Sequence, residues 1–154
     1  MRRCWLPAII TGFLFLLALS ALSVSLAGAD YSVLYGRWDP GSRVFWGDGV
    51  LSVGRQSIAW GRCHDLPYRI YSDQQLPIYP GNVLGAKPKP GAMWRVIVLE
   101  AAEHKCLTHG RYIQFAIPSD YQTHADIVIF RSAERLQKGE PEAAGVFGKI
   151  AGLR

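Results

Sequence analysis

Hydrophobic and polar residues alternate along much of the chain, with the period of two that is typical of β-strands buried on one face. Leu51 and Val53 fall on one face of a short strand, and Ile58 and Trp60 fall on one face of the next. The turn between them, 54–57, begins with a glycine. Pairing Val53 with Ile58 places Leu51 opposite Trp60, so the register is self-consistent and predicts a β-hairpin.

The same alternation predicts further strands, and one segment has the pattern of a helix. The strand segments are 43–46, which meets Val50 across the turn 47–49, and then 68–71, 94–101, 111–117, 126–130 and 145–150. Segment 132–139 is expected to form a short helix, because Ser132 can cap its start and Gly139 can end it. About eight short strands without regular strand–helix alternation predict a mostly β fold, a small antiparallel barrel, with a β-sandwich as the alternative.

Segment 73–92 interrupts the alternation with four prolines and three glycines. We expect a long loop there, with a short edge strand at 78–79. Because long loops often border binding sites, the large aromatic residues in and beside this one are candidate contacts for a ligand or a protein partner. These residues are Tyr79 and Trp94.

Residues 1–29 carry two arginines at their start and then no charged residue. Their apolar centre is followed by small residues that end in Ala27-Gly28-Ala29. This order is that of a secretory signal peptide, cleaved before Asp30. It predicts a single β-rich exported domain over 30–154, periplasmic or secreted. The alternative is an uncleaved membrane anchor formed by residues 4–29, since about 20 apolar residues span a bilayer.

Composition and charge narrow the function classes. The 154 residues are 49% hydrophobic and 19% charged, which excludes a disordered chain. The net charge is +5, and removal of residues 1–29 leaves 15 basic against 12 acidic residues. The basic residues are scattered, and the densest pair is Lys87 with Lys89. A stripe of basic and aromatic residues is missing from the sequence, so nucleic acid is not a predicted partner.

Two cysteines, Cys63 and Cys106, remain after the N-terminal segment is removed. In an exported protein an even number of cysteines predicts a disulfide, and a loop of about 44 residues corresponds to about 4 kcal/mol of stabilisation. A metal site would use the cluster 104–109, His-Lys-Cys-Leu-Thr-His, but its spacing matches no standard zinc pattern. A thiol nucleophile at Cys63 would need His64, which points to the opposite face of a strand. Neither a metal nor a cofactor is therefore predicted.

Catalytic candidates are limited to pairs of histidine with an acidic residue. Glu103 with His104, and Asp120 with His124, are close in sequence and could carry out acid–base chemistry. A meeting of His104 and Glu103 with Asp65 or His64 near the disulfide would favour a small periplasmic hydrolase. The sequence contains neither a nucleophile elbow nor a phosphate-binding loop, so the protein is predicted not to be an enzyme.

The tripeptide Gly36-Arg37-Trp38, at the start of the first strand after the N-terminal segment, resembles the Gly-x-Trp motif that opens lipocalin-like (calycin) β-barrels. The resemblance consists of these three residues and the number of strands. It implies a barrel in which Trp38 plugs the closed end. It also implies a protein that binds an apolar ligand or that inhibits another protein, for instance a lysozyme.

The aromatic content is the remaining functional signal. Residues 30–154 contain four Trp, seven Tyr and four Phe, and large rings can line a pocket or an interface as well as fill a core. Together these features predict a non-enzymatic binder of an apolar ligand or of a protein partner. The alternatives are a small periplasmic hydrolase and a membrane-anchored domain. Trp38 is assigned to the core, and Tyr79 and Trp94 to the contacts.

Overall fold

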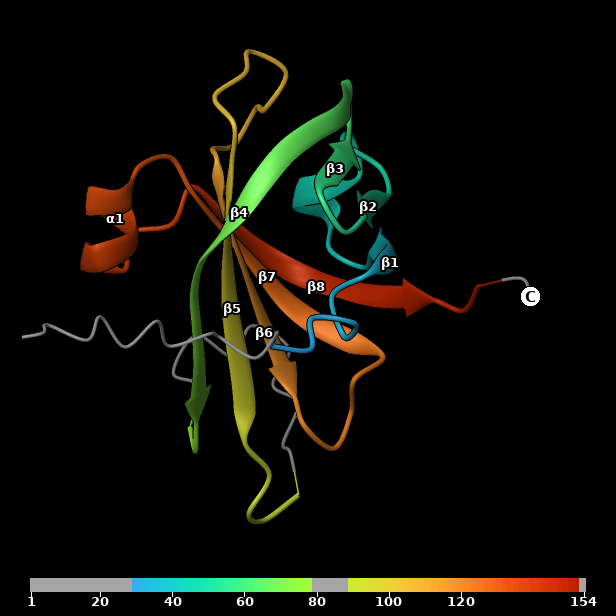
Figure 1. Cartoon of the computed structure of the whole chain (residues 1–154), viewed down its shortest axis with the longest axis vertical. Coiled ribbons are helices and arrows are strands. Elements are labelled where there is room, and N and C mark those ends of the chain that lie inside the picture. The colour runs from blue at the N-terminus through green and yellow to red at the C-terminus, as the bar shows by residue number, and fades with distance from the viewer. Residues whose placement is uncertain (1–28, 79–88, 153–154) are drawn as a thin grey trace, which may run out of the picture.

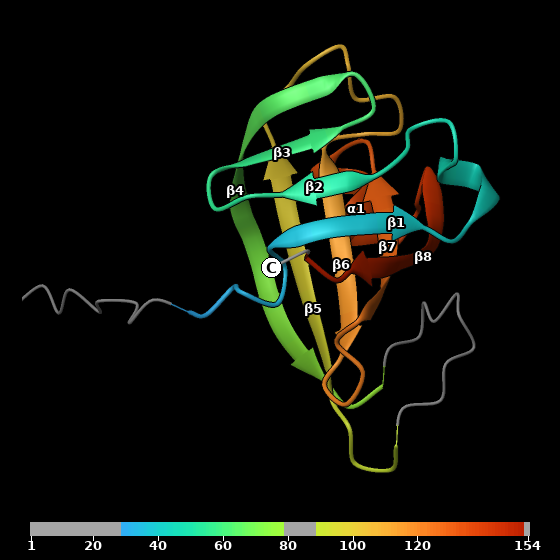
Figure 2. The same ribbon diagram turned by 90° about the vertical axis from the view of Figure 1, so that its right-hand side faces the viewer.

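A computed structural model describes residues 29–78 and 89–152, and over these residues the chain forms a closed antiparallel barrel (Figure 1). Each strand pairs with the next along the chain, and the last pairs with the first. The fold is thus the predicted barrel and not a sandwich. The strands are β1 (Gly36–Pro40), β2 (Leu51–Val53), β3 (Ser57–Trp60), β4 (Cys63–Leu76), β5 (Trp94–Ala101), β6 (Tyr112–Pro118), β7 (His124–Phe130) and β8 (Ala143–Ile150). In Figure 2, β1, β2 and β3 cross in front of the longer strands β5 and β6.

The predicted hairpin is confirmed, because Val53 pairs with Ile58 between β2 and β3. β5 has the predicted bounds, and the predicted strands near β6, β7 and β8 are present with ends shifted by one or two residues. These segments have alternating apolar residues on the inner face of the barrel, so their periodicity and their burial agree.

The prediction of a strand at 43–46 was wrong. Arg43–Phe45 forms a short 3₁₀ helix, η1, in which the amide of Phe45 donates to the carbonyl of Ser42 at 3.1 Å. The tight turn places the Phe45 ring inside the barrel and leaves the neighbouring Trp46 outside. An extended segment also places neighbours on opposite sides, so the alternation did not distinguish the two structures.

The start of the predicted loop 73–92 was also wrong. β4 continues to Leu76, which pairs with Trp94. The end of β4 is polar, with Asp73, Gln74 and Gln75, and lacks the apolar alternation of a strand. Backbone pairing with the full length of β5 holds it in the sheet. Ile78 lies beyond β4, while Tyr79 falls outside the described residues.

Side chains fill the barrel interior. One contiguous cluster of buried residues runs from Trp38 and Phe115 to Phe45 and Phe147, and these four side chains are fully buried. The Trp38 and Phe115 rings meet edge to face, with 5.7 Å between their centroids. An eight-stranded barrel is just wide enough for its own side chains, so rings of this size occupy the space that a ligand would need.

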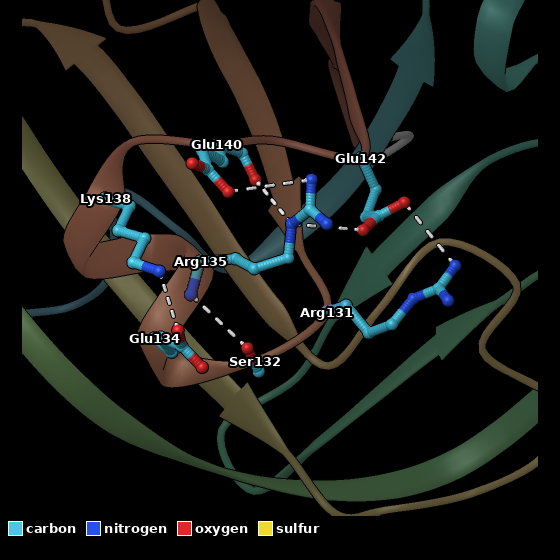
Figure 3. A network of polar contacts seen from close by, with 7 residues as sticks. All are labelled: Arg131, Ser132, Glu134, Arg135, Lys138, Glu140 and Glu142. Carbon is cyan, nitrogen blue, oxygen red and sulfur yellow. Dashed lines mark hydrogen bonds and ion pairs between the residues drawn. The ribbon is translucent and has the colours of Figure 1, made fainter.

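The helix α1 (Ala133–Lys138) confirms the predicted helix and lies outside the barrel (Figure 1). Leu136 packs on apolar side chains of the outer barrel face, among them Val98 and Phe130. Ser132 caps the helix by accepting from the amide of Arg135 at 3.3 Å, and Gly139 ends it in the left-handed conformation. Figure 3 shows the surrounding ion pairs, in which Glu134 contacts Lys138, Glu140 and Glu142 contact Arg135, and Glu142 also contacts Arg131. These exposed pairs contribute little to stability, so packing and caps hold the helix.

Of the part of the chain that is described, no helix is long and apolar enough to cross a membrane. The predicted signal peptide lies almost entirely in residues 1–28, outside the described residues.

Candidate functional site

The two ends of the barrel are closed by different segments. We call one the Trp38 end; it is covered by residues 31–35, where Leu34 is fully buried. The other, at the top of Figure 1, is the disulfide end, formed by loops 41–50, 61–62 and 102–111. The disulfide end carries most of the features that indicate a site.

A cluster of rings closes the disulfide end from within. The Phe45 centroid lies 5.4 Å from that of Trp60 and 5.1 Å from that of Phe147. The imidazole of His109 meets the Phe45 ring edge to face, with 5.5 Å between centroids. His109 therefore rests on the aromatic cluster with one edge and faces the neighbouring loop with the other.

His109 pairs with Asp48, 61 residues away in the sequence. The His109 Nε2 atom lies 2.9 Å from Asp48 Oδ2, and the Thr108 hydroxyl donates to Asp48 Oδ1 at 3.0 Å. The backbone of Asp48 is held on both sides: its amide donates to the carbonyl of Phe45 at 3.0 Å, and its carbonyl accepts from the amide of Gly61, in the turn between β3 and β4, at 3.0 Å. Next to it, Gly49 has a positive φ of 69° and accepts from the Trp60 indole at 3.2 Å. Two distant loops are thereby joined by polar contacts.

A surface cavity of about 580 Å³ lies over this junction. We call its rim the Trp46 surface, defined by Val44, Trp46, Asp48, Arg62 and His109. Trp46 is 60% exposed and Val44 is 49% exposed. The Arg43 guanidinium lies 5.7 Å from the centre of the Trp46 ring. The surface thus combines large apolar groups with charged groups around a depression.

The predicted disulfide between Cys63 and Cys106 is present, with 5.3 Å between the Cα atoms. It ties the loop 102–111 to the start of β4, directly beside the Trp46 surface. His104 lies at the same bond, where its Nδ1 accepts from the amide of Cys106 at 3.2 Å.

The two candidate pairs of an acidic residue with a histidine do not form. Glu103 contacts Arg111 at 3.6 Å, and Asp120 accepts from the amide of Lys89 at 2.9 Å. His124 stacks on Tyr121, with 4.7 Å between ring centroids. The pair that does form, Asp48 with His109, was missed because neither residue has its partner nearby in the sequence.

The geometry of Asp48 and His109 favours a role in linking the loops 41–50 and 102–111, and not a catalytic role. The Thr108 hydroxyl donates to the carboxylate and not to the imidazole, so His109 does not activate it as a nucleophile. In sequence, the only local signal for this site was the Gly-Asp-Gly turn at 47–49.

Comparisons with protein-family models, curated proteins and solved structures found no match to this chain. The barrel is established by its strand pairing, and membership of the lipocalin-like family stays a prediction.

The residues assigned from the sequence lie in different environments. Trp38 is fully buried and its indole donates to the carbonyl of Leu34 at 2.8 Å, the surroundings that a plug requires. Lys149 lies over the same ring, with Nζ 5.2 Å from its centroid, and burial lowers the pKa of this lysine. Trp94 is only 2% exposed on the outer face of β5, so a partner would reach it only after a rearrangement. Its contact role, like that of Tyr79, stays a prediction.

The Trp38 end carries a smaller cavity of about 300 Å³. Gln75, near the end of β4, and Met93, directly before β5, line this cavity. Arg95 also lines this cavity, but both of its donor groups that face Asp73 are engaged, at 2.8 and 3.1 Å. The cavity therefore lies near the segment where the sequence predicted a binding site, but its arginine, Arg95, is already paired with Asp73.

Glu100 forms a compact ionic cluster on the outer face of β5, with Arg69, Arg111 and Tyr112. The Tyr112 hydroxyl donates to the carboxylate at 2.9 Å, and Arg69 Nε donates at 2.6 Å. Burial by itself raises the pKa of Glu100, but the hydrogen bonds from Arg111, Tyr112 and Arg69 outweigh it and hold the pKa below its ordinary value. The cluster cross-links β4, β5 and β6 close to the disulfide end.

Proposed function

We propose that this chain is an exported, non-enzymatic binding protein that recognises a protein partner through the Trp46 surface. The observation that carries the proposal is the 60% exposure of Trp46 beside a cavity of about 580 Å³. An exposed tryptophan beside Arg43 and Arg62 matches the composition of protein-interface centres, where Trp and Arg are enriched.

The filled interior favours a partner on the surface over an apolar ligand inside. Trp38, Phe115, Phe45 and Phe147 occupy the barrel along its length and contact one another within a single buried cluster. A ligand of ordinary size would need roughly 300 Å³ or more of concave space. The cavity of about 580 Å³ beside Trp46 offers that space at the surface, whereas fully buried rings occupy the interior of the described barrel.

The position of the exposed groups supports the same choice. Six large hydrophobic side chains are exposed among the described residues. Two of them, Val44 and Trp46, line the same cavity. The loops beneath them are fixed by the Asp48–His109 contact and by the disulfide. A rigid surface loses little conformational entropy on binding, which favours affinity.

Export is part of the proposal. The disulfide between Cys63 and Cys106 is typical of proteins from oxidising compartments. The uncharged run that ends in Ala27-Gly28-Ala29 has the pattern of a cleaved signal peptide. The intact mass of the exported protein tests this: a mature chain that begins at Asp30 is expected, and a full-length chain that stays with the membrane would contradict it.

Site-specific photo-crosslinking tests the partner. A photoreactive amino acid replaces Val44, which is 49% exposed on the same surface, in the full chain expressed in the source cells. A matched chain carries it at Tyr121, which is 52% exposed at the Trp38 end. We expect a discrete protein adduct from position 44 and none from position 121.

Binding of the isolated partner then provides the quantitative test. Trp46→Ala is expected to weaken the Kd at least tenfold, since central tryptophans contribute about 2 kcal/mol or more. Tyr121→Ala should leave the Kd within twofold. Equal effects of the two substitutions, or a small molecule that copurifies inside the barrel and is retained by Trp46→Ala, would contradict the proposal.

A further inference from the structure

Three side chains with metal-ligating atoms meet at the disulfide end. Cys63 comes from the start of β4, and His104 and Cys106 come from the loop after β5. One ligand atom from each lies within 4.8 Å of the other two. The sequence did not reveal this group, because the third donor is about 40 residues from the other two and so no standard spacing exists.

The disulfide withholds two of the three donors. While the sulfurs are bonded to each other they are not thiolates, and metals bind the thiolate form. A dithiol reductant changes this: its two thiol hydrogens and two electrons convert the Cys63–Cys106 bond into two thiols, and the reductant becomes a disulfide. Loss of the two thiol protons on metal binding then produces two thiolates beside one imidazole.

We propose that Cys63, His104 and Cys106 form a Zn²⁺ site that is available only when their disulfide is reduced. Two thiolates and one imidazole are a ligand set that zinc prefers, with a fourth position for water. At Zn–S distances of about 2.3 Å and Zn–N distances of about 2.0 Å, tetrahedral ligand atoms lie about 3.5 Å apart. The His104 nitrogen lies within 4.8 Å of both sulfurs, so it must approach them by at most about 1.3 Å. The two sulfurs must move apart once their bond is broken.

The loop 102–111, which must move His104 toward the sulfurs, is exposed around that residue. Glu103, His104 and Lys105 are exposed and belong to no strand or helix. The Nδ1 atom of His104 accepts from the Cys106 amide, which holds the imidazole beside the sulfur. A zinc ion bound at Nδ1 would replace this single hydrogen bond. The buried Cys63, anchored in β4, would stay fixed while the loop closes onto the metal.

The test uses the untagged protein from residue 30 onward, prepared oxidised and after reduction by a phosphine, and titrated with Zn²⁺ against a chelator. We expect one equivalent to bind the reduced protein at least a hundredfold more tightly than the oxidised protein. His104→Ala should weaken zinc binding by the reduced protein at least tenfold. His124→Ala, a histidine at the opposite end of the barrel, should bind as the parent protein does. Co²⁺ should give the thiolate charge-transfer absorption of a tetrahedral site only after reduction.

Reduction of the disulfide could by itself destabilise the protein, so a second measurement compares the thermal unfolding of the reduced protein with and without Zn²⁺. Zinc that binds the native arrangement should raise the Tm of the reduced protein, or restore its fold, and leave the oxidised protein unchanged. The proposal is overturned if zinc does not affect the reduced protein, if both redox forms bind it equally, or if His104→Ala binds it as tightly as the parent.

Discussion

The two ends of the barrel are both closed, yet they are closed by different kinds of contact. At the Trp38 end the closing segment is adjacent in sequence to the strand it covers, and Trp38 donates to the carbonyl of Leu34 only four residues away. At the disulfide end, the loop 41–50 meets the loop 102–111, about 60 residues further along the chain, through Asp48 and His109 and beside the disulfide. Closing long loops costs chain entropy, so long-range closure requires stronger links, here a covalent bond and the hydrogen-bonded contact of Asp48 with His109.

If the proposed function holds, this difference also separates the end that stabilises the barrel from the end that binds a partner. The aromatic residue that marks the Trp38 end is fully buried, while Trp46 at the disulfide end is 60% exposed. The Trp38 end is filled by a buried side chain, whereas the disulfide end presents an exposed side chain on loops that are linked to each other. The predictions below test this division.

The largest effect is expected for Trp38→Ala. Removal of a fully buried indole leaves a cavity next to Phe115 and should lower the free energy of unfolding by about 3–5 kcal/mol. Chemical denaturation of the oxidised protein measures it. Because the ring contacts of Trp38, with Phe115 and Lys149, do not involve the disulfide, the loss should be the same within about 0.5 kcal/mol after reduction; a strong dependence on the disulfide would show that the two ends are not independent.

Removal of the disulfide should have a nearly equal effect on the free energy of unfolding. Cys63→Ser with Cys106→Ser is expected to lower the free energy of unfolding by about 4 kcal/mol, from the entropy of a loop of that length. Hydrogen exchange should show the loss of protection concentrated in 41–50 and 102–111. Uniform loss over both ends would contradict the assignment of the bond to one end.

Asp48→Asn should have a moderate effect, because it weakens the contacts to His109 and Thr108 without creating a large cavity. We expect about 1 kcal/mol in the oxidised protein. The loss should be larger in the double serine variant, where the same loops lack the disulfide. Additive losses would indicate that the contact and the bond brace different segments.

Acid should weaken the disulfide end through Glu100, whose pKa is lowered in the folded protein. A lowered pKa means that its contribution is complete above the unfolded value of about 4.3 and is lost as the pH falls through the folded value. Glu100→Gln should therefore flatten the dependence of unfolding free energy on pH below about 5. Denaturant titrations at a series of pH values measure this, and an unchanged slope would contradict it.

The smallest effect on stability is expected for Trp46→Ala, within about 0.5 kcal/mol, because an exposed side chain loses little on truncation. The same denaturation experiment used for Trp38 provides the measurement. A loss of several kcal/mol would place Trp46 in the structural core of its end and remove the main support for the proposed binding surface.

The sequence by itself determined much of the barrel. The Val53–Ile58 register, the bounds of β5 and the capped helix α1 follow from local alternation and local capping, which need no knowledge of distant residues. The disulfide followed from the count of cysteines, because residues 30–154 contain two cysteines and so allow only one pairing.

Only the tertiary structure decided the turn at η1, the length of β4 and the candidate site. The Phe45 ring is buried at the disulfide end, where it packs on Trp60 and Phe147. The polar end of β4 is a strand because its backbone pairs with β5. Asp48 meets His109, and Cys63 meets His104, across 61 and about 40 residues. Strand pairing around a closed barrel creates these neighbours, and no pattern within a short window of sequence contains that information.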